Sequence, residues 1–401
     1  MNNINLGLSD LFINYQCLII NKIMKFKYRF SIKVFLFISI ICFLQSCSLL
    51  SMVVDEEFHK ISDTLDLTLK NNELIFPVTI NDRATSLLFD TGSETPLLYD
   101  DNALNNKKSK KISKFGSVNN FGNKLDFYRT PLSLETELFK SNNTVFVVLP
   151  NFYAINKCSK REVTGIFYGK YFKDKIFNIN FEQGKLFIID SLKNRTYTEI
   201  ESKFFGLTQV KIKLKVNGKS EWFHFDTGNV SHPMILNQKS EIIQNIKYDY
   251  NVRSNSLGLV EKQNSTYFYE NLKISFGDDR VDSYAVTNDG FNKYKHNNVG
   301  IQFIKNYNWI IDYKNKKVYY KSYKKSEINS IKVTKDHLNV CAVEEGKLVI
   351  VQTFDQTGSP SYKLGVQIIS VNNVPITSKN ICSYLKFLNK TDWNILDIET
   401  Q

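Results

Sequence analysis

The tripeptide Asp-Thr-Gly occurs twice in this chain of 401 residues, each time at the end of an alternating apolar run. One copy begins at Asp90 and the other at Asp226, 136 residues later. Residues 73–92 align without a gap with residues 209–228, and both segments end in Phe-Asp-Thr-Gly. Such self-similarity predicts one structural unit used twice, with one carboxylate contributed by each copy.

Paired carboxylates can perform acid–base chemistry that a single carboxylate cannot. Two carboxylates about 3 Å apart cannot both ionise, so they titrate as a pair that shares one proton. The ionised member would take a proton from a water molecule held between Asp90 and Asp226. The protonated member would donate to the carbonyl oxygen under attack. The repeat therefore predicts hydrolysis of the kind that aspartic proteases perform.

A second marker follows each aspartate. A Gly-Ile step lies about 75 residues later, at Gly165 in the first half and at Gly300 in the second. Each step precedes a strand–turn–strand pattern, over residues 177–188 and 309–320. We therefore expect Gly165 and Gly300 to occupy equivalent positions in the two units.

With these motifs the chain resembles the pepsin/retropepsin superfamily, and most closely bacterial aspartyl proteases whose two retropepsin-like halves lie in one chain. The resemblance covers about residues 67–325. It implies an all-β, bilobal double β-barrel with Asp90 and Asp226 as the catalytic pair. It also implies an endopeptidase that acts on peptide or protein substrates as a monomer with an internal pseudo-twofold axis, without a cofactor or metal.

The residues after each aspartate have supporting roles in that family. Gly92 and Gly228 permit a tight loop and leave backbone N–H groups free to reach carboxylate oxygens. Thr91 and Thr227 are expected to bind backbone across the pseudo-twofold axis and so lock the two lobes together.

The next position differs between the two loops. Ser93 matches the family's usual hydroxyl residue and could donate to the outer oxygen of Asp90, whereas the second loop carries Asn229, whose amide could donate to Asp226. Asn229, and the lack of a flap tyrosine, leave open an alternative function. In that alternative the chain is a catalytically inactive lipoprotein that binds peptides.

Composition favours an all-β fold and excludes a nucleic-acid partner. The chain has 21 tyrosines and 30 phenylalanines, in short alternating runs bounded by Asn, Asp, Gly and Lys. Residues 1–46 hold five basic residues and one acidic residue, so the net charge of +12 falls to +8 without them. The other Lys and Arg residues are largely interspersed with acids, which is typical of a solvated surface.

The N-terminal residues predict export. A basic segment from Lys25 to Lys33 precedes an apolar run of 11 residues, too short to span a membrane, and the run ends in a lipobox-like sequence at Cys47. We predict a signal peptide over residues 1–46, with Met24 as an alternative start. Lipidation of Cys47 would then anchor the chain to the bacterial cell envelope, facing the periplasm or the cell surface.

The other cysteines and the histidines give no site pattern. Besides Cys47, the processed chain retains Cys158, Cys341 and Cys382, whose spacing predicts neither a disulfide framework nor a metal site. His224 alternates with apolar residues on the strand before Asp226, and we predict that it packs there rather than binding a ligand.

The two lobes are predicted over residues 67–192 and 204–324, after a tether over residues 47–66. Glycine-containing turns near residues 113–123 and 255–258 lie where the family has flap hairpins. A short polar connection then leads to a C-terminal module.

The C-terminal module resembles a PDZ domain over residues 331–401. Gly365 to Asn373 is similar to the PDZ core Gly-Asp-x-Ile-x-x-Ile-Asn-Gly, with Val366 in place of Asp and Asn373 in place of Gly. PDZ domains bind extended peptides by adding a strand to a sheet edge. The alternative is a small β module that packs on the protease and stabilises it.

Two further expectations concern this module. Its helix is predicted over residues 378–388 and its last strand over residues 393–399. Because the connection over residues 326–330 is short and mostly polar, few contacts are expected to cross between the module and the second lobe.

Overall fold

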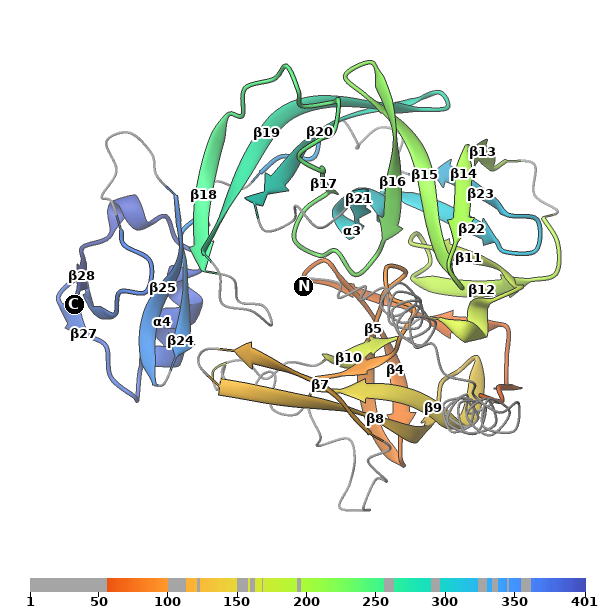
Figure 1. Ribbon diagram of the computed structural model, residues 1–401, viewed down its shortest axis with the longest axis horizontal. Coiled ribbons are helices and arrows are strands. Elements are labelled where there is room, and N and C mark those ends of the chain that lie inside the picture. Colours follow the sequence, from red (N-terminus) through yellow and green to blue (C-terminus); the bar gives the residue numbers. More distant parts are fainter. Residues whose placement is uncertain are drawn as a thin grey trace, which may run out of the picture. The chain divides into compact units, whose positions relative to one another are not determined.

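The structure is a computed structural model, and the chain it describes is predominantly β, as the sequence predicts (Figure 1). Residues 57–401 form one compact unit. The predicted signal peptide, Cys47 and the start of the tether lie outside the described residues. In the described part of the chain no helix is long and apolar enough to cross a membrane. The structure describes residues 56–99, 113–120, 123–149, 158, 163–167, 169–192, 196–255, 263–289, 296–323, 330–333, 338–344, 346–354 and 362–401.

Strands of the first half form a nine-stranded sheet. Strand β8 pairs with both β4 and β9, so the path β9-β6-β10-β5-β4-β8 closes into a ring. Strand β7 extends the ring as a hairpin with β8. The strands are β1 (His59–Lys60), β3 (Thr68–Lys70), β4 (Glu73–Ile80), β5 (Arg83–Phe89), β6 (Leu97–Leu98), β7 (Ser113–Asn120), β8 (Asn123–Glu135), β9 (Phe139–Val148) and β10 (Val163–Phe167).

Strands of the second half repeat this order. Strand β19 pairs with both β15 and β20, which closes the path β20-β17-β21-β16-β15-β19 into a second ring. Strand β18 forms a hairpin with β19, as β7 does with β8. The strands are β14 (Ser202–Phe205), β15 (Gln209–Val216), β16 (Lys219–Asp226), β17 (Met234–Ile235), β18 (Tyr250–Asn255), β19 (Gln263–Phe276), β20 (Asp279–Asn288) and β21 (Asn297–Gly300).

The sequence repeat is also a structural repeat. Strands β4 and β15 each have eight residues, and each leads through a two-residue turn into the strand that ends at an aspartate. Asn81 and Asp82 in one turn, and Asn217 and Gly218 in the other, have positive φ. That conformation matches the twist of tight hairpins and is tolerated by Asn, Asp and Gly. The turn chemistry thus fixes the same hairpin in both halves.

A six-stranded sheet joins the two halves. Its order is β13-β23-β22-β11-β12-β2, and β11 of the first half pairs antiparallel with β22 of the second. Two short helical turns, η2 (Lys170–Phe172) and α3 (Ile301–Ile304), lead into these strands. The strands are β2 (Thr64–Asp66), β11 (Ile176–Asn180), β12 (Lys185–Ile189), β13 (Thr198–Ile200), β22 (Tyr307–Asp312) and β23 (Lys317–Ser322).

Part of the predicted tether belongs to the fold. Strands β1 and β2 lie within residues 47–66, and Leu65 is buried while Phe58 packs edge-on against Phe139. Apolar side chains that alternate with polar ones gain stability by joining a sheet edge, so the chain becomes ordered before Leu67. One continuous apolar core then extends through both halves.

The C-terminal residues form a separate small core around Leu348, Ile368 and Trp393. Strand β26 pairs with β27 and β28 in a three-stranded sheet, and β24 pairs with β25. The elements are β24 (Val340–Glu344), β25 (Lys347–Phe354), β26 (Ile368–Val371), β27 (Val374–Pro375), α4 (Ile381–Leu388), η5 (Trp393–Ile395) and β28 (Ile398–Thr400).

Two predicted boundaries in this module were wrong. Helix α4 begins at Ile381 rather than Ser378, because Asn380 accepts a bond from the Thr377 backbone N–H and so stabilises a turn before the helix. Trp393 lies in η5 rather than in the last strand. Its indole N–H donates to the Leu388 carbonyl at the helix end, which requires the chain to turn back there. Asn373 has a positive φ, a conformation that asparagine tolerates.

The expectation that few contacts cross to the second lobe was also wrong. Strand β25 pairs antiparallel with β18, with Arg253 opposite Thr353, and so extends the second-half sheet to ten strands. The backbone N–H of Ile331 donates to the carbonyl of Asp282 at 2.8 Å. A polar connection says little about pairing further along the chain, because a strand with a free edge recruits any compatible strand.

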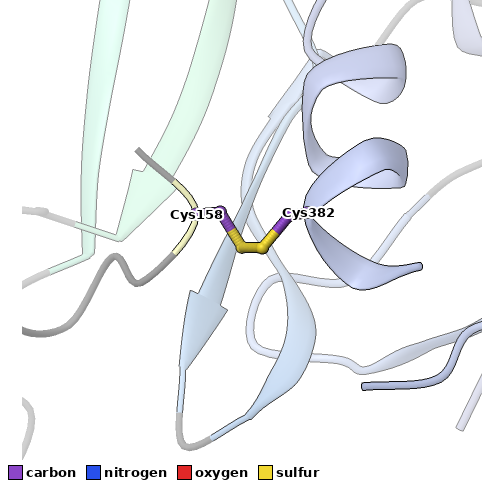
Figure 2. Close-up of a disulfide and its surroundings, with 2 residues drawn as sticks. All are labelled: Cys158 and Cys382. Atoms are coloured by element: carbon purple, nitrogen blue, oxygen red, sulfur yellow. A yellow bond between two sulfur atoms is a disulfide. The ribbon is translucent and has the colours of Figure 1, made fainter. Parts of the chain in front are cut away.

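A disulfide joins Cys158 to Cys382 on α4, which corrects the prediction that the cysteines form no bridge (Figure 2). The two residues are 224 positions apart in the sequence. A pairing between such distant segments leaves no spacing pattern in the sequence. Cys341 remains a free, buried thiol, and burial raises its pKa to about 12.

Candidate active site

The two Asp-Thr-Gly loops emerge from equivalent buried strands. Asp90 follows β5 and Asp226 ends β16, and each strand lies parallel to a second strand, β10 or β21. The side chains of Phe89 and Phe225, which precede the aspartates, are fully buried. Packing on both faces of these strands therefore holds the loop bases rigid.

The threonines of the two loops bind each other's backbone reciprocally. The Thr91 hydroxyl donates to the Phe225 carbonyl at 2.8 Å, and the Thr227 hydroxyl donates to the Phe89 carbonyl at 2.6 Å. Each hydroxyl oxygen also accepts the backbone N–H of the other threonine at 3.0 Å. This is the arrangement expected from the sequence, and it fixes the separation of the two loops.

The two carboxyl groups are in direct contact. The side chain of Asp90 hydrogen-bonds that of Asp226, and each is only 7% exposed. A Cβ atom on Gly228 would lie 2.2 Å from Cγ of Asp90, and one on Gly92 would lie 2.5 Å from Cγ of Asp226. Glycine is therefore required in both loops, because any side chain would occupy the space of the opposite carboxyl group.

The pKa of Asp90 is raised well above its ordinary value. Burial is the largest cause, followed by the charge of Asp226 and the hydrogen bond between the two side chains. The backbone N–H of Gly92, which donates to Oδ1 at 2.9 Å, acts in the opposite direction. Asp90 therefore holds a proton at a pH where an exposed aspartate is ionised.

Asp226 receives more hydrogen bonds than Asp90. Its Oδ1 accepts the backbone N–H groups of Gly228 at 3.0 Å and Asn229 at 3.1 Å. Its Oδ2 accepts the side-chain amide of Asn298 at 2.6 Å. Bonds of this kind favour the ionised carboxylate. Asn298 was missed in the sequence. The available signal was a polar residue two positions before Gly300 in a buried strand.

The residues after the two glycines do not make the predicted side-chain bonds. The Ser93 hydroxyl donates to the Thr95 carbonyl at 2.9 Å rather than to Asp90. The Asn229 amide donates to Oδ1 of Asn298 at 2.9 Å rather than to Asp226. Both side chains meet nearer acceptors, which sequence spacing does not reveal.

Strand register corrects the predicted equivalence of Gly165 and Gly300. Phe167 pairs with Phe89 in the first half as Val299 pairs with Phe225 in the second. Counted from these pairs, Gly165 lies two residues before Phe167, whereas Gly300 follows Val299. The two Gly-Ile steps therefore occupy different positions in their sheets.

His224 lies beside this network. It is opposite Asn298 on β21, and its Nε2 is buried without a hydrogen bond among the described residues. Burial lowers the pKa of His224, and the charges of Lys211 and His296 act in the same direction, against that of Asp226. A neutral, packed imidazole agrees with the predicted packing role.

The chain matches no protein-family model, and a search of curated proteins finds no match either. Among the residues that the structure describes, no three His, Cys, Asp or Glu side chains are grouped so that they could hold a metal ion. The case for function therefore rests on the geometry of the two loops.

Proposed function

We propose that this protein is an aspartic endopeptidase of the pepsin/retropepsin type. The observation that carries the proposal is the contact between the carboxyl groups of Asp90 and Asp226, held by the reciprocal bonds of Thr91 and Thr227. A merely structural turn has no need of two buried carboxyl groups in contact, because burying them costs free energy.

The hydrogen bonds support a division of roles between the two aspartates. Ionised Asp226 takes a proton from a water molecule as that water attacks the scissile carbonyl carbon. Protonated Asp90 donates to the carbonyl oxygen and stabilises the tetrahedral intermediate. The proton gained by Asp226 then passes to the leaving amine as the C–N bond breaks. The hydroxyl group formed from the carbonyl oxygen returns its proton to Asp90, which restores the starting protonation state.

The strand pairing supports a bilobal, double-barrel form of this enzyme class. Each half closes a ring of six strands, and a sheet built from both halves joins them. The β7–β8 and β18–β19 hairpins are the candidate flaps. Residues 113–117, which were predicted as a turn, lie in strand β7 instead. The predicted turns at residues 121–122 and 256–258 lie outside the described residues.

The C-terminal module is proposed to act mainly as a structural element. One edge of β25 pairs with β18 and the other with β24, so β25 is not free to take a peptide strand. This pairing favours the stabilising alternative over peptide capture, at least for this strand. It also fixes β18, the outer strand of the second candidate flap.

The disulfide supports export. Structural disulfides form in oxidising compartments, which agrees with a lipid-anchored protein of the cell envelope. Mass spectrometry of the mature N-terminus tests this part of the proposal. A diacylated Cys47 is expected, and an unmodified Cys47 in a freely soluble protein would contradict it.

Digestion of a peptide library by the wild type and by Asp90→Asn tests the proposed activity. The wild type should cleave and Asp90→Asn should not, because an amide cannot donate and recover the catalytic proton. Asp82→Asn is the matched control, since it makes the same change on the same hairpin and Asn tolerates the positive φ of that position. Binding of peptides without cleavage by the wild type would favour the inactive peptide-binding alternative.

A further inference from the structure

A relay of two amides connects the second catalytic loop to its aspartate. The Asn229 amide donates to Oδ1 of Asn298, and the Asn298 amide donates to Oδ2 of Asp226 at 2.6 Å. Asn298 lies on β21, the strand parallel to β16, so its position depends on the sheet and not on the loop. The relay is therefore anchored at both ends.

The orientation of both amide groups follows from one backbone donor. The backbone N–H of His232 donates to Oδ1 of Asn229 at 3.4 Å, which leaves the Asn229 amide nitrogen to face Asn298. Asn298 must then present its oxygen to Asn229 and its nitrogen to Asp226. An N–H donor to Oδ2 of Asp226 stabilises the ionised carboxylate more than the protonated carboxyl group.

Among the described residues, the first half has no counterpart of this relay. Leu88 is opposite Ile166 there, as His224 is opposite Asn298 in the second half. Ile166 is apolar and buried, and the Ser93 hydroxyl is engaged with Thr95. Among the described residues, the carboxyl group of Asp90 thus has the Gly92 backbone N–H as its one donor apart from its bond to Asp226.

Given the proposed function, on which this inference rests, we propose that Asn298 is a positioning residue that places the shared proton on Asp90 and makes Asp226 the general base. Asn229 orients Asn298 and acts on the dyad through it. The assignment comes from the hydrogen-bond inventory of the two carboxyl groups.

Other charged groups near the dyad enter the pH behaviour. The carboxyl group of Asp90 faces that of Asp226. His224 lies two residues before Asp226 on β16. Lys211 on β15 and His296, just before β21, both act on His224. An activity change near the ordinary pKa of an imidazole would be assigned to titration of His224. The effect of Asn298 is therefore measured on the acidic limb of the pH profile.

The test is the pH dependence of kcat/KM for the wild type and Asn298→Ala. Loss of the Asn298 amide removes a donor to the proposed general base. The acidic limb should therefore move to higher pH by about one unit, the effect of one hydrogen bond to a charged group. The alkaline limb, which reports Asp90, should stay in place. Asn229→Ala should give a smaller shift in the same direction.

Asn297→Ala is the matched control. Asn297 is the neighbouring asparagine on β21 and bonds Glu221 and the Asn237 backbone rather than the dyad. Its removal should change stability without moving the acidic limb. A uniform loss of kcat in Asn298→Ala with an unmoved limb, or an equal shift in Asn297→Ala, would overturn the inference.

Carbon-13 NMR of the aspartate carboxyl groups separates this inference from the proposed function, because it needs no turnover. The Asp226 signal is assigned as the one absent from Asp226→Asn. The pH at which this signal changes should be higher in Asn298→Ala than in the wild type, because the variant lacks the amide donor to the carboxylate. An unchanged Asp226 titration refutes the role of Asn298 even in an active enzyme. The expected shift in a protein that cleaves nothing would instead count against the proposed function alone.

Discussion

The two halves of the molecule share strand order, hairpin turns and reciprocal threonine bonds, yet they differ in the hydrogen bonds that reach their aspartates. Asp226 accepts two backbone N–H groups and an amide from Asn298, whereas Asp90 accepts one backbone N–H. The shared parts set where the carboxyl groups lie. In the proposed mechanism, the hydrogen bonds that differ between the halves make Asp226 the base and Asp90 the proton donor, so one repeated fold supports two chemical roles.

The largest expected effect concerns the dyad as a unit. Asp90→Asn and Asp226→Asn should each lower kcat/KM by about 10³-fold or more, and the double variant should be no worse than either single variant. Each turnover needs both a general base and a proton donor. Loss of either carboxyl group therefore stops the reaction, and loss of the second has no further effect. Steady-state kinetics on a cleaved library peptide measure this, and more than about a tenth of wild-type activity in Asp226→Asn would contradict a shared mechanism.

The variants Thr91→Val and Thr227→Val test whether the two threonines contribute equally to stability. Each change removes a hydroxyl that donates to one buried carbonyl and accepts one buried N–H, so each should lower the free energy of unfolding by about 3 kcal/mol. Denaturant unfolding gives the two values, and Thr→Ser at the same positions is the control. A large difference between the two valine variants would show that their contributions are unequal.

The disulfide should contribute somewhat less. Cys158→Ser with Cys382→Ser should lower the free energy of unfolding by about 2 kcal/mol, the lower end of the range usual for disulfides. Addition of a reductant to the wild type should have the same effect and none on the double variant. Equal stability of the oxidised wild type and the double variant would show that the strand pairing alone holds the C-terminal module.

The smallest expected effect is a pH dependence of the free energy of unfolding that arises from Asp90 in the first half. The pKa of Asp90 is raised in the folded state, so the folded chain binds more protons than the unfolded chain above pH about 4. Unfolding free energy should therefore fall as pH rises through this window, by at most about 1.4 kcal/mol per pH unit. Asp90→Asn should remove this slope in chemical denaturation at stepped pH, and an unchanged slope would assign it to other groups.

The sequence predicts the repeated hairpins and the Asp-Thr-Gly loops because these depend on neighbouring residues. Turn residues such as Asn217 and Gly218 and the alternating apolar positions before Asp226 carry that information locally. Asn298 and the partner of Cys158 were not predictable in the same way. Asn298 meets Asp226 only because β21 lies parallel to β16, and the register of a parallel pair is set by packing along the whole strand.

The position of Cys382 near the end of the chain has a consequence for biosynthesis. With Cys47 lipidated as proposed, a growing chain exposes Cys158 and Cys341 before Cys382 exists, so a wrong bridge between these two is the earliest available error. The same C-terminal segment removes that error, since Asn389 bonds the backbone of Cys341 and Leu385 packs in its core. Formation of α4 therefore brings Cys382, the correct partner, to Cys158. The same step buries Cys341, the wrong partner.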